Sequence, residues 1–189
     1  MTTRNLPVEI AAARAPIKPG TGEYTAMPAS SYSATARPPA DQLWLTPIYL
    51  RAGTLNRIGI NVTTAGGAGA VARMGVYADS DGAPGALLLD TTVTATATAY
   101  TEATISLAVG DGAYWLGLVI QGSPSPAPIV TCANTYPSFQ IATTTAAWCF
   151  TGVTAIARAR SSVTGALPDP AGTSGATGQT VPIVAVRYA

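Results

Sequence analysis

The stretch TLNRIGINVTTAGGAGAVARMGVYADSDGAPGALLLD, residues 54–90, carries two strand patterns and a hairpin signal. In the first pattern apolar residues occupy alternate positions: Ile58, Ile60 and Val62. A second pattern follows a glycine-rich loop, with the apolar residues Ala72, Met74 and Val76 on one face. A period of two indicates strands that have one buried face. The cluster DSDGAPG then predicts a turn into a further apolar run at 87–89.

The acidic turn has two interpretations, a calcium loop or a plain hairpin turn. Asp79 and Asp81 lie close together within it. An EF-hand loop needs further oxygen ligands at fixed positions. A plain hairpin turn is therefore the preferred interpretation, and we expect no metal site there.

Composition excludes several kinds of site. The chain has 189 residues, of which 48% are hydrophobic and 10% are charged, against about 25% charged in an average soluble protein. Its formal net charge is +1, so no basic field favours nucleic acid as a partner. Histidine is absent, which removes Ser-His-Asp and Cys-His catalysis and the usual zinc sites. The nine acidic residues are scattered; a glycosidase pair brought together by folding stays possible, but we expect no catalytic residue and no cofactor.

The two cysteines and the apolar segments bear on compartment. Cys132 and Cys149 are either bridged or free and buried, and we favour free thiols. No secretory signal follows Met1, and no window approaches the roughly 20 apolar residues of a membrane helix. The sequence thus predicts synthesis in a cytoplasm, without membrane insertion.

Residues 1–40 differ from the remainder, 41–189. They contain six prolines and four of the ten basic residues, which disfavours both a long helix and a regular sheet strand. We interpret them as an extended arm, either a disordered terminus or a segment that packs on a neighbouring subunit. The second interpretation is preferred because side chains suited to attachment recur along the arm: Leu6, Val8, Ile10, Arg14 and Ile17.

The remaining sequence predicts about nine or ten short strands and no helix. Pro47 within 42–50 suggests an edge strand or a bulge. Residues 113–122 are apolar on both faces, as in a central strand. In 90–108 small or apolar residues alternate with threonine, which would place Val93, Ala95, Ala97 and Ala99 inward. Residues 167–180 are expected to be a long loop, and 181–189 a closing strand. This predicts an all-β fold, a single antiparallel β-sandwich of jelly-roll type, with simple meander connections as an open alternative.

Three segments together resemble a known module: 44–90, 105–122 and the closing PIVAVRY. The hairpin matches the pattern G-x-Y-x-D-x-x-G-x-PG-x-LL, through Gly75, Tyr77, Asp79, Gly82, Pro84, Gly85, Leu87 and Leu88. A G-x-YWL strand follows, with Gly112, Tyr114, Trp115 and Leu116. These segments are similar to a β-sandwich module of bacteriophage tail fibres and minor tail proteins. The resemblance implies a structural protein located in the virion, with other virion proteins as partners and a homotrimeric assembly.

Three function classes follow from these observations. The first is a non-enzymatic virion protein, a head decoration, head fibre or tail component anchored by its arm. The second is a receptor-binding tip or carbohydrate-binding module for a host surface glycan, in which aromatic side chains would stack on sugars. Trp115 and Trp148 lie in apolar strands and favour a core position, which leaves Trp44, Tyr136 and Tyr188 as ligand-facing candidates. The third class, an enzyme such as a depolymerase, has no specific residue in its favour.

Overall fold

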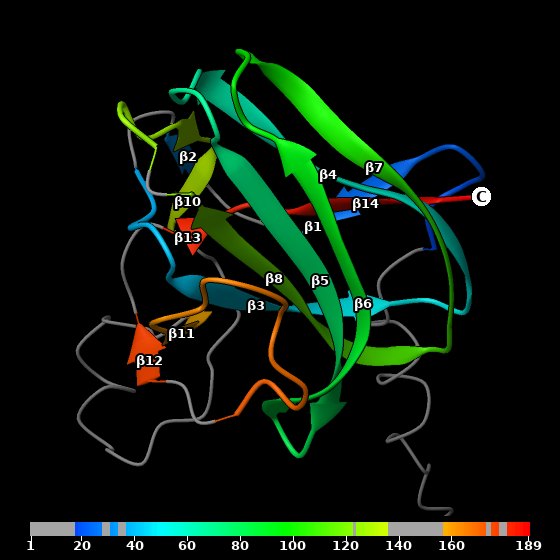
Figure 1. The fold of residues 1–189 in the computed structure, drawn as a ribbon. Helices are drawn as coiled ribbons and strands as arrows, with labels where there is room; N and C mark the ends of the chain where they lie inside the picture. The colour runs from blue at the N-terminus through cyan, green and yellow to red at the C-terminus, as the bar shows by residue number, and fades with distance from the viewer. Residues whose placement is uncertain are drawn as a thin grey trace, which may run out of the picture.

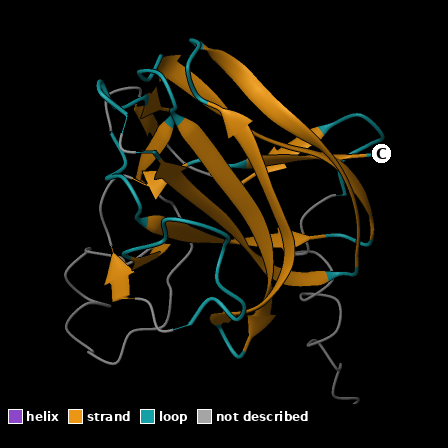
Figure 2. Cartoon of the chain, in the orientation of Figure 1, coloured by secondary structure: helices purple, strands orange, loops and turns teal. Residues whose placement is uncertain are grey.

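A computed structural model describes the following residues: 18–27, 31–33, 37–122, 124–135, 157–172, 175–177 and 181–189. All regular structure in these ranges is β-strand, joined by loops and turns (Figure 2). The described ranges hold no helix, so none of them supplies a helical membrane span. The predicted all-β class is confirmed.

Two large antiparallel sheets form a sandwich (Figure 1). The first, here called the five-stranded sheet, has the order β1-β14-β4-β7, and β9 also pairs with β4. Its strands are β1 (Tyr24–Ala26), β14 (Ala185–Tyr188), β4 (Gly53–Thr64), β7 (Ala99–Val109) and β9 (Ile129–Val130).

The second, here called the six-stranded sheet, has the order β12-β11-β3-β8-β5-β6. Its strands are β12 (Gly175–Thr177), β11 (Ala157–Arg160), β3 (Leu43–Leu50), β8 (Gly112–Gln121), β5 (Val71–Ser80) and β6 (Ala83–Thr94). A small third sheet joins β13 (Val181–Pro182), β10 (Cys132–Thr135) and β2 (Ser31–Ser33).

The strand order identifies the connectivity. Eight strands form the frame of the sandwich: β1, β3, β4, β5, β6, β7, β8 and β14. When these eight strands are numbered from 1 to 8 in chain order, the five-stranded sheet has the order 1-8-3-6. The six-stranded sheet has the order 2-7-4-5. Within this frame only β5 and β6 are consecutive neighbours, whereas a meander pairs consecutive strands throughout. The order is that of a jelly roll, built from interleaved Greek keys.

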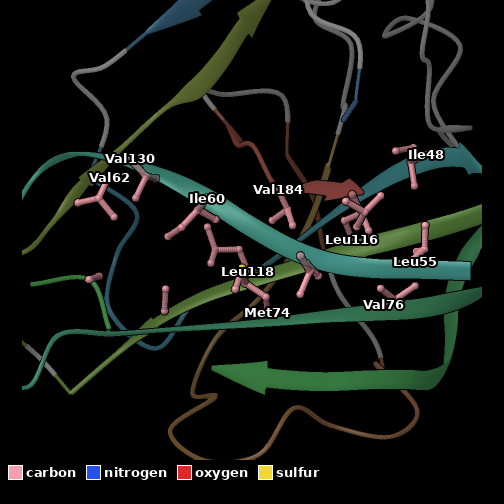
Figure 3. Packing of buried hydrophobic residues seen from close by; sticks show 14 of the residues in the cluster. Ile48, Leu55, Ile60, Val62, Met74, Val76, Leu116, Leu118, Val130 and Val184 are labelled. Atoms are coloured by element: carbon pink, nitrogen blue, oxygen red, sulfur yellow. The ribbon is translucent and has the colours of Figure 1, made fainter. Parts of the chain in front are cut away.

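The main core lies between the two sheets. Alternate residues of β4, β5 and β8 point inward, as their periodicity predicted, and they meet residues of β3 and β14. Figure 3 shows the contacts made by Ile48, Leu55, Ile60, Val62, Met74, Val76, Leu116, Leu118, Val130 and Val184. Burial of these side chains removes apolar surface from water and drives association of the sheets.

The central part of the outer face of the six-stranded sheet is also covered. The segment 161–172, here called the strap, packs Val163, Leu167 and Ala171 against the outward residues of β3, β5 and β8. It is orange in Figure 1. A Cβ atom on Gly75 would collide with the Leu167 side chain and would lie 2.7 Å from the Leu89 carbonyl oxygen. Only glycine therefore leaves room for Leu167 at this position of β5. The strand β8 has buried side chains on both of its faces, as predicted for a central strand.

Polar bonds tie the strap to the sheet. The Gln121 amide Nε2 donates to the carbonyl oxygens of Val163 and Gly165 at 2.8 and 2.7 Å. The Leu167 backbone N–H donates to Asp90 Oδ2, 3.0 Å away, and Asp90 also accepts two bonds from Arg73. These contacts fix the strap over the sheet at several points.

The N-terminal region differs from its prediction. β1 pairs with the C-terminal strand β14, and β2 pairs with β10. Met27 is buried, with 2% of its surface exposed. The proline content assigned residues 24–26 and 31–33 to the arm. Residues 24–26 are instead a strand of the five-stranded sheet, and 31–33 are a strand of the small third sheet, so the domain begins before the predicted boundary at 40/41. Pairing with a distant strand overrides a weak local strand signal.

Smaller differences occur in three segments. The break in 90–108 falls at 95–98 rather than near Tyr100, which leaves Ala97 and Ala99 exposed instead of inward. The predicted loop 167–180 contains β12, and the single closing strand is divided into β13 and β14 in different sheets. Pro47 lies at a sheet edge, which is one of its two predicted positions. Among the described strands, β11 pairs only with residues 43–45 of β3, so around Pro47 the strand β3 pairs with β8 alone.

Candidate functional site

Two of the aromatic residues predicted to face a ligand lie in the interior. Trp44 is 8% exposed and packs against Ala157 and Val181. Tyr188 is 2% exposed, and its hydroxyl accepts from the Arg51 N–H and donates to the Arg51 carbonyl, each at 3.0 Å. Both rings complete the core, so neither offers a face to a sugar. The prediction for these two residues is corrected accordingly.

Several other predicted residues lie outside the described ranges. They are the third aromatic candidate, one cysteine and the attachment residues of the arm: Tyr136, Cys149, Leu6, Val8, Ile10, Arg14 and Ile17. Cys132 is described, and it is free and buried, as predicted for it. Burial raises the pKa of its thiol to about 12, which keeps the thiol protonated and unreactive at neutral pH.

The acidic turn is a hairpin turn, as predicted. Asp81 and Gly82 have φ values of 53° and 73° and form the two-residue loop between β5 and β6, which is the conformation that a type I′ turn requires. The Asp79 carboxylate accepts from the Gly82 N–H at 3.0 Å and from Trp115 Nε1 at 2.7 Å. Asp79 thus binds the turn to the central strand. Within the described residues no group of three or more His, Cys, Asp or Glu side chains is placed to hold a metal ion.

The exposed aromatic residues gather on a different surface. Tyr24 on β1 and Tyr100 on β7 are each 44% exposed. Their ring centroids lie 5.6 Å apart, with the ring planes at 86°. This edge-to-face arrangement is favoured between aromatic rings. The two residues come from opposite edges of the β1-β14-β4-β7 order, on the face of the five-stranded sheet that points away from the core.

Three charged side chains complete this cluster: Glu102, Arg57 and Arg187. Together with Tyr24 and Tyr100 they form the surface that is here called the tyrosine face. The Tyr24 hydroxyl donates to Glu102 Oε2 at 2.6 Å, and Arg57 Nε lies 3.1 Å from Glu102 Oε1. The Arg187 guanidinium carbon lies 5.6 Å from the centre of the Tyr24 ring, which is within the range of a cation–π contact. The cluster therefore combines aromatic surface, one carboxylate and two guanidinium groups.

Gly59 on β4 makes this arrangement possible. It pairs with Glu102 on β7 and lies beneath the side chain of Tyr100. A Cβ atom at this position would lie 2.7 Å from the Tyr100 hydroxyl oxygen and 2.6 Å from the Thr101 carbonyl oxygen. The absent side chain lets Tyr100 extend across β4 toward Tyr24 on the far side of β14.

The electrostatics of the cluster keep both phenols neutral. The hydrogen bond to Glu102, followed by desolvation, raises the pKa of Tyr24 above its ordinary value. Burial, together with the neighbouring Tyr24 and Glu102, raises the pKa of Tyr100. Both hydroxyls therefore remain hydrogen-bond donors throughout the physiological pH range.

The sequence contained part of the signal for this surface. In residues 99–109 the alternation places Tyr100, Glu102 and Thr104 on one side of a strand. Tyr24 lay in the segment interpreted as an arm, and Arg187 lies at the other end of the chain. Only the pairing of β1 with β14 and of β14 with β4 brings these residues together.

Comparisons of the chain with protein-family models, with curated proteins and with solved structures find no match.

Proposed function

We propose that this protein is a non-enzymatic structural component of a bacteriophage particle, where it displays its β-sandwich on the surface as a head decoration, head fibre or tail component. The observation that carries the proposal is the role of the residues that resemble the phage module. Asp79 joins the hairpin turn to Trp115, and Tyr77 packs beside Gly117 on β8. These residues build a scaffold, which supports a display module and gives no support to a catalytic role.

The attachment element in this proposal is the segment 1–17. Tyr24 begins a strand of the five-stranded sheet, and the side chains suited to attachment all precede it in the sequence. Its apolar side chains Leu6, Val8, Ile10 and Ile17 would each contribute about 1.5–3 kcal/mol on burial against a capsid or tail subunit. Arg14 would add a charge-assisted contact to an acidic neighbour.

Ordering such a segment costs about 1–2 kcal/mol per residue, so one copy gains little net affinity. A homotrimer overcomes this limit, because linked copies bind with a high effective concentration. The proposal therefore includes a trimer, as the module resemblance implies. Light scattering on the full chain at micromolar concentration should give the mass of three chains, and a monomer mass would contradict this part of the proposal.

The attachment role is tested by adding purified chains to phage particles that lack the protein. The full chain should decorate the particles, and a chain without residues 1–17 should keep its cooperative unfolding transition but lose decoration. Leu6→Asp and Ile10→Asp should each reduce occupancy, whereas Thr104→Ala, an exposed change on β7, should not. Equal occupancy with and without residues 1–17 would reject the anchor.

The alternative is a receptor-binding module that recognises a host surface glycan. The specific observation in its favour is the exposed Tyr24–Tyr100 pair. Antibody labelling of purified particles separates the two functions: label over the head shell supports decoration, and label confined to the tail tip supports receptor binding.

A further inference from the structure

The tyrosine face has hydrogen-bonding capacity that the fold does not use. Arg57 uses its Nε toward Glu102 and its Nη1 toward the Asn56 carbonyl oxygen. Arg187 uses its Nε toward Asn56 Oδ1 at 3.0 Å. Within the described part of the chain, Arg57 Nη2 and both Nη groups of Arg187 make no hydrogen bond. These donors surround two rings that are each 44% exposed.

The charges of the face do not cancel. Arg57 forms an ion pair with Glu102. The partners of Arg187 are an amide oxygen and an aromatic ring, and neither carries a formal charge. One guanidinium charge therefore remains without a counter-ion in this cluster. A guanidinium presents a planar pair of donors that matches the two oxygens of a carboxylate.

The rings indicate the remaining part of the ligand. Exposed tyrosine carbon and C–H surface packs against the apolar face of a sugar ring, while the Glu102 oxygens, which retain unused lone pairs, accept from sugar hydroxyls. Because the cluster spans β1, β14, β4 and β7 on a sheet face, a chain of several sugar units can lie across it.

We propose that the tyrosine face binds an acidic saccharide, a sugar chain that carries carboxylate groups. Its carboxylate pairs with Arg187, and a sugar ring packs on Tyr24 and Tyr100. The inference sharpens the glycan-recognising alternative proposed above. It is tested on the purified chain without any particle, so its failure leaves the structural role of the protein untouched.

The experiment uses the full chain on an array of bacterial capsular polysaccharides and lipopolysaccharide O-antigens. Each acidic polysaccharide is printed beside its carboxyl-reduced form, in which the carboxylate has become a primary alcohol. We expect at least one acidic polysaccharide to bind, with a signal at least tenfold above its reduced form. Absence of any signal above that of the heat-denatured chain, or equal binding of the reduced form, would overturn the inference.

Variants locate the binding surface. Arg187→Gln and Tyr100→Ala should each weaken binding of the selected polysaccharide at least tenfold. The controls are Tyr49→Ala and Arg51→Gln. Tyr49 is an exposed tyrosine on the six-stranded sheet, and Arg51 pairs with Asp111 at the turn before β4. Both controls should stay within twofold of the unmodified chain; a tenfold loss in either control, or unchanged binding in both test variants, would refute the assignment.

A measurement on the unmodified chain covers the case in which a variant fails to fold. Hydroxyl-radical labelling followed by mass spectrometry should show that the bound polysaccharide protects Tyr24 and Tyr100 at least threefold, with Tyr49 unprotected. Protection of Tyr49 without protection of Tyr24 and Tyr100 would place the ligand elsewhere and contradict the inference.

Discussion

The two large sheets of this jelly roll differ in how many of their faces are covered. The six-stranded sheet is buried on one side by the main core, and the strap covers the central part of its other side. The five-stranded sheet shares the main core, but its other face carries the partly exposed tyrosine face. Among the described residues, one sheet therefore has buried side chains on both faces, whereas the other has partly exposed side chains on its outer face.

The largest expected loss of stability follows from removing a large side chain from the face that the strap covers. Trp115→Ala removes a side chain that is 2% exposed and a hydrogen bond to Asp79. We expect the free energy of unfolding to fall by about 3–5 kcal/mol. Denaturant titration measures this loss, with Thr104→Ala on the free face as a control that should change stability by less than about 0.5 kcal/mol. Similar losses in the two variants would remove the distinction between the sheets.

The strap should contribute almost as much as the strand beneath it. Leu167→Ala leaves a cavity above Gly75 and should cost about 2–4 kcal/mol. Limited proteolysis gives a second measurement, because a loosened strap should be cleaved faster within 161–172 than in the unmodified chain. If Leu167→Ala left both stability and cleavage unchanged, the strap would be a surface loop and the sheet beneath it would have only one covered face.

Two arginine–carboxylate pairs allow a direct comparison of the faces. Arg73 binds Asp90 through two bonds of 2.7 and 2.8 Å, and Asp90 also accepts from the Leu167 N–H. Asp90→Ala leaves these donors without their acceptor beneath the strap and should cost about 1–3 kcal/mol. Glu102→Ala breaks the pair with Arg57 on the free face and should cost less than about 1 kcal/mol. A larger loss at Glu102 than at Asp90 would reverse the comparison.

The smallest expected effect is on the pH dependence of folding stability, through Cys132. Burial raises the pKa of Cys132 to about 12, from a reference of 9.0. The folded chain therefore retains this proton in a range where the unfolded chain loses it, so the contribution to stability is complete below pH 9 and is lost as pH rises toward 12. Unfolding measured between pH 7 and 10.5 should show an earlier decline in the native chain than in Cys132→Ala. Parallel curves would mean that the thiol is accessible in the folded state.

The same thiol gives a kinetic test. In a Cys149→Ser background, Cys132 should react with a disulfide reagent at pH 8 only as fast as the domain opens. Reaction at the rate of a free thiol peptide would show that this part of the core is open to solvent.

The sequence predicted the sandwich because long strands alternate strictly. In β5 and β8 every inward and outward position follows from the period of two, and the Asp-Gly dipeptide marks the hairpin between β5 and β6. The jelly-roll order could not be predicted in the same way, because β14 pairs with β4 across most of the length of the chain. Local patterns contain no information on which distant strands become neighbours.

The covered and free faces were the least predictable features. The strap has the composition of an ordinary loop, and its effect depends on Gly75 leaving space for Leu167. Trp44 and Tyr188 are amphipathic residues in strand patterns, and such residues occupy either the core or a binding surface. Tyr24 lies in a three-residue strand, which is too short to show alternation. Its exposed position depends on its partner strand.

Hydroxyl-radical footprinting of the free protein tests the difference between the two sheets most directly. Mass spectrometry would compare Tyr24 and Tyr100 on the free face with Tyr77 and Trp115, which are 0% and 2% exposed beneath the strap. The structure predicts at least tenfold faster labelling of Tyr24 and Tyr100 under native conditions, with the difference lost in denaturant. Labelling of Tyr77 and Trp115 at the same rate as Tyr24 and Tyr100 in the folded chain would contradict a sheet that is covered on both faces.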